Sequence, residues 1–105
     1  MATQGSGILT TGTLGSVTTG TNWFQPFENK PFNIWISGTF SATVQIVRSN
    51  DNGVTWVPIA QPDLSAVLSI TTPMTFASIE PNAAVLWTVQ CTAYTSGTVN
   101  YRFDT

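Results

Sequence analysis

The chain has 105 residues, 42% of them hydrophobic, and its three basic and five acidic side chains give a formal net charge of −2. This length accommodates one hydrophobic core, so a single folded domain is expected. Three cations can neutralise few phosphates, which argues against nucleic-acid binding. There is no apolar run of roughly 18 residues, nor a basic start followed by an apolar stretch, so neither a membrane span nor a signal peptide is expected.

The first 21 residues are mostly glycine, threonine and serine, with apolar side chains only at isolated positions. This composition predicts an extended N-terminal arm over residues 1–21, followed by a folded domain over residues 22–105. An unstructured terminus is the alternative, but an arm of this length could reach roughly 65 Å and contact a neighbouring subunit. The candidate partner-contact residues in and beside the arm are Ile8, Leu9, Leu14, Val17, Trp23 and Phe24.

After Trp23, apolar and polar residues alternate with the period of two that indicates β-strands. The expected strands cover residues 32–37, 43–47, 54–59, 66–70, 74–79, 85–94 and 98–103. The last two are expected to form a hairpin through Thr95-Ser96-Gly97. Seven or eight short strands without a helix predict an all-β, antiparallel two-sheet β-sandwich of jelly-roll or immunoglobulin-like topology.

A turn signal lies between two of these strands: Ser49-Asn50-Asp51-Asn52-Gly53-Val54-Thr55-Trp56 has the spacing of an Asp-box hairpin. Asn and Gly tolerate a left-handed backbone, and an aspartate can accept hydrogen bonds from the amides that follow it. Asp51, Asn52 and Gly53 are therefore expected to form a structural turn, because the spacing does not match a calcium-binding loop.

The same turn fixes which residues share a face of the sheet. Either of two loop lengths pairs the flanking strands so that one face carries Val44, Ile46, Val57 and Ile59. This face is expected to lie in the core, with Trp56 on the opposite side.

Catalytic side chains are scarce in this sequence. The chain has no histidine, and its single cysteine, Cys91, lies in an apolar alternating run where a buried and inert thiol is expected. Five carboxylates fall in expected turns or at strand ends, where acidic residues are normally solvated: Glu28, Asp51, Asp63, Glu80 and Asp104. A glycosidase built on two of them is the enzymatic alternative. The prediction is a protein without enzyme activity, cofactor or metal.

Two tryptophans are expected on outer faces of the sheets, because Trp35 and Trp56 alternate with the apolar residues of their strands. An exposed tryptophan on a sheet can stack on a sugar or anchor a protein contact, and otherwise covers the edge of the sandwich. Trp35 and Trp56 are therefore further candidate partner-contact residues. A glycan is the one small ligand that this pattern favours.

Two parts of the chain resemble small structural proteins of tailed bacteriophages. The first comprises residues 32–40 and 43–49, followed by the turn Asp51-Asn52-Gly53 and by Thr55-Trp56. The second comprises residues 91–99, followed by Tyr101-Arg102, and the resemblance covers about half of the chain. The N-terminal segment and residues 62–73 lie outside it, although these are the parts of the chain that are expected to contact a partner.

The resemblance implies a non-enzymatic β-sandwich in the virion, on the capsid surface, assembled in the host cytoplasm. Such a head decoration or cement protein would bind the major capsid protein and neighbouring copies of itself. The alternative is a tail- or fibre-associated β-sandwich module that binds a carbohydrate receptor.

Overall fold

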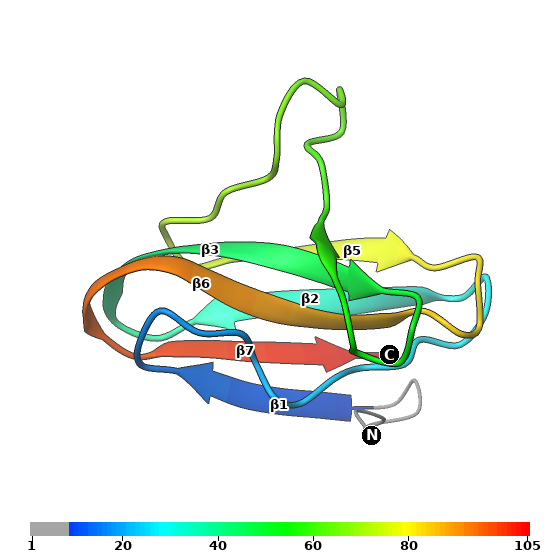
Figure 1. Cartoon of the computed structure of the whole chain (residues 1–105), viewed down its shortest axis with the longest axis horizontal. Coiled ribbons are helices and arrows are strands. Elements are labelled where there is room, and N and C mark those ends of the chain that lie inside the picture. The colour runs from blue at the N-terminus through cyan, green and yellow to red at the C-terminus, as the bar shows by residue number, and fades with distance from the viewer. Residues whose placement is uncertain (1–8) are drawn as a thin grey trace.

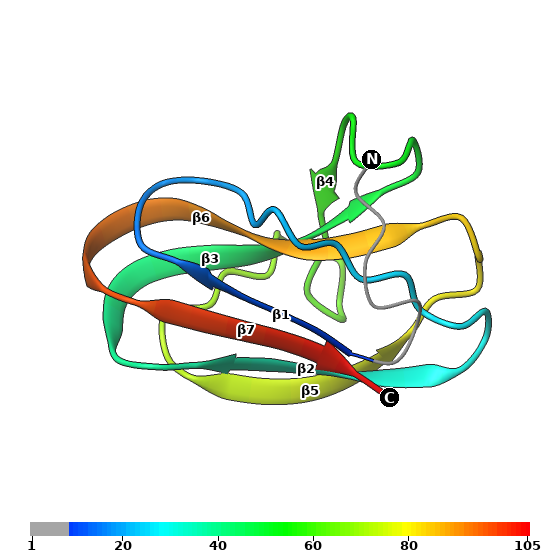
Figure 2. The same cartoon turned by 90° about the horizontal axis from the view of Figure 1, so that it is seen from below.

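The computed structural model describes residues 9–105, so the candidate contact residue Ile8 lies outside the described residues. Seven strands form two antiparallel sheets, ordered β1-β7-β2-β5 and β4-β3-β6, which pack face to face (Figures 1 and 2). The strands are β1 (Leu9–Leu14), β2 (Pro31–Ser37), β3 (Phe40–Ser49), β4 (Val57–Pro58), β5 (Met74–Ile79), β6 (Leu86–Gly97) and β7 (Val99–Asp104). The described residues contain no helix, and the predicted all-β sandwich is confirmed.

An eighth extended segment, residues 18–24, lies along β6 on the side away from β3. Gly20 N donates to Val89 O at 2.8 Å, and Phe24 and Trp87 exchange two backbone hydrogen bonds of 2.8 Å. When this segment is counted as strand 2, β1 remains strand 1 and β2 to β7 become strands 3 to 8. The two sheets then have the strand orders 1-8-3-6 and 2-7-4-5. This is the strand order of a jelly roll, which distinguishes the two topologies that the sequence left open.

The arm predicted over residues 1–21 is wrong for residues 9–21. β1 pairs with β7 over its whole length, from Leu9 opposite Asp104 to Leu14 opposite Val99, and the Leu14 side chain is buried in the core. The glycines in this region allow close packing, because a Cβ on Gly12 would lie 2.2 Å from Tyr101 Oη. The composition indicated flexibility, but threonine favours strands once a partner strand supplies the hydrogen bonds.

The hairpin predicted at Thr95-Ser96-Gly97 is also wrong, because β6 and β7 belong to different sheets. The chain turns a corner between the sheets here and again between β2 and β3, where Thr98 N donates to Thr39 O at 2.9 Å. Gly38 and Gly97 have φ values of 102° and 88°, and a Cβ on Gly97 would lie 2.1 Å from Thr39 O. A turn signal is local and does not reveal whether the next strand pairs or crosses over.

The core lies between the sheets and follows the predicted alternation. Phe24 stacks on Phe103 with 5.4 Å between ring centroids, and Val44 and Ile46 are fully buried as predicted. The predicted strand over residues 54–59 is reduced to β4, and residues 66–70 contribute only isolated bridges. Ile59 packs against the core, but Val57 is 69% exposed, because it pairs with Arg48 at the end of a two-residue edge strand.

Candidate functional site

The loop after β3 is held by one carboxylate. Asp51 accepts hydrogen bonds from Thr55 N at 2.9 Å, from Thr55 Oγ1, and from Ser49 Oγ at 2.8 Å. Asn52 and Gly53 have φ values of 64° and 85°. The bonds from Thr55, and then the one from Ser49, lower the pKa of Asp51 to about 2. The carboxylate is thus engaged inside the turn, where it stabilises the loop.

A groove of about 500 Å³ lies beside this loop, and Arg48, Trp56, Ile59 and Asn82 are among its lining residues. Its lining therefore combines hydrogen-bonding groups with an aromatic ring and aliphatic side chains. Sites for small ligands commonly have this composition and a volume of several hundred Å³.

An ion pair with a buried carboxylate, that of Glu80, fixes the Arg48 guanidinium group beside the groove. Glu80 is 0% exposed, and its Oε1 accepts bonds from Arg48 Nε at 2.8 Å and from Trp87 Nε1 at 2.9 Å. Its Oε2 accepts from Asn82 N at 3.1 Å, and the Arg48 Cζ atom lies 5.5 Å from the Trp87 ring centroid. Arg48 is 43% exposed, and its guanidinium group is held by Glu80. The pair therefore places N–H donors beside the groove and adds little net charge.

The expectation that Glu80 is solvated is therefore wrong. Burial of a carboxylate is tolerated only when its oxygens are paired and hydrogen-bonded, and here a cation, an indole and a backbone amide provide this. Arg48 lies on the same face of β3 as Val44 and Ile46. A basic residue in that alternation was the one sequence signal for a buried acidic partner.

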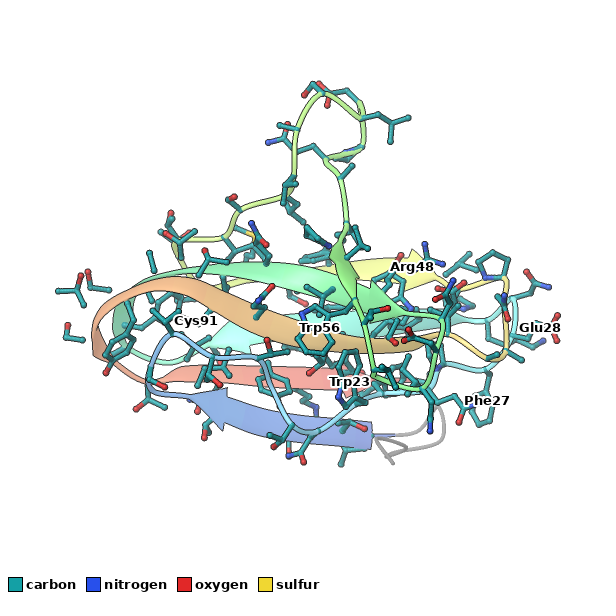
Figure 3. All side chains as sticks on the ribbon, viewed as in Figure 1. Trp23, Phe27, Glu28, Arg48, Trp56 and Cys91 are labelled. Atoms are coloured by element: carbon teal, nitrogen blue, oxygen red, sulfur yellow. The ribbon has the colours of Figure 1, made fainter. Side chains whose placement is uncertain are left out.

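Trp23 and Trp56 pack together over the outer face of the β3–β6 sheet, with 5.7 Å between ring centroids (Figure 3). With Val47 and Leu86 they form a second, smaller apolar cluster. Trp56 thus lies on the outer face, as predicted, where it covers the sheet and also lines the groove.

Three predicted partner-contact residues are corrected by their burial: Leu14, Trp23 and Phe24 are buried within this chain. Leu14 is buried because β1 pairs with β7, whereas Phe24 enters the main core and Trp23 packs against Trp56 because residues 18–24 dock on β6. Their side chains are therefore unavailable to a partner in this fold, whereas Leu9 and Val17 are exposed.

Trp35 lies on the outer face of the four-stranded sheet and is 44% exposed. Asp104 on the same face accepts hydrogen bonds from Arg102 Nε at 2.6 Å and Asn33 Nδ2 at 2.9 Å. Bonds from Arg102, Asn33 and Trp35 lower the pKa of Asp104. The result is a hydrogen-bonded polar face with one half-exposed indole.

Residues 60–67 form a projecting loop, which overlaps the segment 62–73 that was expected to contact a partner but was predicted to contain a strand rather than a loop. Its tip carries Leu64, which is 80% exposed, and the loop stands clear of both sheets (Figure 1). The signal was present as Asp63 two residues before Ser65, the spacing of a side-chain-capped turn.

No three histidine, cysteine or acidic side chains of residues 9–105 lie where they could hold a metal ion. The Cys91 thiol is buried, and burial raises its pKa. Residues 9–105 also include no helix with the length and hydropathy needed to cross a membrane.

Comparisons of the chain with protein-family models, with curated protein sequences and with solved structures gave no match. The fold and surface define its class: a small jelly roll with a low charge, a projecting loop and a groove beside the Arg48–Glu80 ion pair.

Proposed function

We propose that this chain is a non-enzymatic structural protein of a tailed-bacteriophage virion. It sits on the capsid surface, binds the major capsid protein and neighbouring copies of itself, and stabilises the head. The observation that carries the proposal is the shape of the molecule, a jelly roll with one internally bonded loop projecting from it. Such a shape favours contact with a large surface.

The chemistry of the surface supports the same role. With three basic and five acidic residues, the chain has few charges with which to attract or repel a partner. Contact must then depend on shape, apolar side chains and neutral hydrogen-bonding groups. The fold is held by packing, because Cys91 is a free and buried thiol. The resemblance of residues 32–56 and 91–102 to phage structural proteins adds to this support.

The test is sedimentation of the purified chain with heads assembled from the major head protein of the same genome and lacking this chain. The proposal predicts that the chain sediments with the heads to a saturating ratio and raises the temperature at which they break open. Gly97→Val serves as the unfolded control. Its side chain would collide with Thr39 O, so the chain cannot form the corner between the sheets. Absence of sedimentation by the wild-type chain would refute the proposal.

The groove at Trp56 favours a second candidate function, a tail- or fibre-associated module that binds a neutral glycan. Sugar-binding sites combine an aromatic ring with fixed hydrogen-bond donors, as this groove does. Because the Arg48–Glu80 pair adds little net charge, a neutral sugar is favoured. Val57 lines the groove and is exposed, whereas Val54 is exposed without lining it. Glycan-array binding that is lost in Val57→Trp but kept in Val54→Trp, without head binding, would favour this function.

A further inference from the structure

The 60–67 loop is a structured projection. Ala60 and Val67 form a β-bridge at its base, Gln61 N donates to Ala66 O at 2.8 Å, and Leu64 N donates to Gln61 O at 2.8 Å. These bonds close the loop on itself. The tip therefore holds a defined shape at a distance from the sandwich (Figure 1).

Leu64 at the tip is unfavourable for the free protein in two ways. Its φ of 61° lies in the left-handed region, which glycine and asparagine adopt far more readily than leucine. Its side chain is also 80% exposed. The hydrogen bonds of the loop hold this backbone conformation, but the Leu64 side chain belongs to neither apolar cluster of the described residues, so its exposure points to a function outside the folded chain.

The remaining side chains of the tip fix Leu64 in place. Asp63 Oδ1 accepts hydrogen bonds from Ser65 Oγ at 2.7 Å and from Ser65 N at 3.0 Å. These bonds from Ser65 lower the pKa of Asp63, which is the one charged residue of the loop. The tip therefore presents one large aliphatic side chain, Leu64, on a hydrogen-bonded base, while Val67 at that base is only 39% exposed.

The chemistry of this tip selects one kind of partner. It has no aromatic ring to stack on a sugar or a base and no cation to meet phosphate or anionic lipid. One leucine buries too little apolar surface to hold a protein on a bilayer. A pocket in a protein surface that encloses one aliphatic side chain is the fitting complement.

We propose that the 60–67 loop is the docking element of this chain and that Leu64 inserts into an apolar pocket of the major head protein. This inference rests on the proposed function, since it names the residue through which the head would be bound. A rigid anchor loses little conformational entropy on binding, which suits a protein present in many copies.

The experiment compares head binding by wild type, Leu64→Asn and Val54→Asn. Asparagine tolerates the left-handed backbone, so Leu64→Asn should melt at the wild-type temperature or above it. Its head affinity should fall roughly tenfold or more, because a buried leucine contact is lost. Val54→Asn removes an exposed valine elsewhere and should bind as wild type.

The two proposals fail in different ways. If wild type binds heads and Leu64→Asn binds equally well, the docking inference is overturned and the proposed function stands. If wild type does not bind heads, the proposed function and the inference built on it are both overturned.

A second measurement does not depend on the stability of the asparagine variant. Cys91 is buried, so Leu64→Cys introduces an accessible thiol at the tip, and heads in excess of the raised Kd keep this variant bound. Head binding should slow its reaction with a maleimide at least tenfold. Reaction at the free rate in the bound state would overturn the inference.

Discussion

Replacing Glu80 with alanine should destabilise the fold far more than the loss of a surface acid would. The substitution leaves Trp87 Nε1, a buried donor, without its acceptor, which costs about 1–3 kcal/mol. Arg48 is 43% exposed and can rehydrate, so losing its ion pair adds less than about 1 kcal/mol. The substitution also removes the acceptor of Asn82 N, so the free energy of unfolding should fall by about 3 kcal/mol in total.

Urea unfolding followed by tryptophan fluorescence measures this loss, and the melting temperature should fall by roughly 12–20 °C. Arg102→Ala is the matched control, because it breaks an exposed ion pair with Asp104 and should cost less than about 1 kcal/mol. Arg48→Ala combined with Glu80→Ala should cost less than the sum of the single changes, by up to the roughly 1 kcal/mol assigned to the ion pair. A loss below about 1 kcal/mol for Glu80→Ala would refute the reasoning, since it would mean that the carboxylate is solvated.

Three further predictions concern the turn, the corner and the thiol. The pKa of Asp51 is lowered from 3.8 to about 2, so its stabilising effect is complete above pH 3.8 and is lost as the pH falls through about 2. Unfolding titrations at different pH values should show a smaller loss in Asp51→Asn than in wild type, because the lowered pKa values of Asp63 and Asp104 remain. Gly97→Ala should cost more than about 2 kcal/mol, because the added Cβ meets Thr39 O at a positive φ, whereas Gly15→Ala meets no atom and should change stability by less than about 1 kcal/mol. The Cys91 thiol should react with a thiol reagent at the rate of global unfolding, and fast reaction in the folded protein would contradict its burial.

Local chemistry and period-two alternation predicted part of this fold well. The burial of Val44 and Ile46 follows from alternation along one strand, which depends only on neighbouring residues. The left-handed backbone at Asn52 and Gly53 belongs to a turn whose hydrogen bonds span few residues. These features did not require knowledge of which strands pair.

The remaining features depend on partners distant in sequence. β1 is a strand because β7 lies beside it, and nothing within its Thr- and Gly-rich sequence indicates that partner. Glu80 is buried because Arg48, 32 positions earlier, reaches it. Leu64 was missed as a contact residue because its exposure and backbone conformation come from bonds at the loop base.

An electron cryomicroscopy map of heads saturated with this chain tests the central claim most directly. The account predicts jelly-roll density on the outer surface, with the 60–67 loop directed into the head protein and the Leu64 side chain enclosed by it. Density that contacts the head through another face, with Leu64 in solvent, would contradict the docking element. Heads without added density would contradict the proposed function.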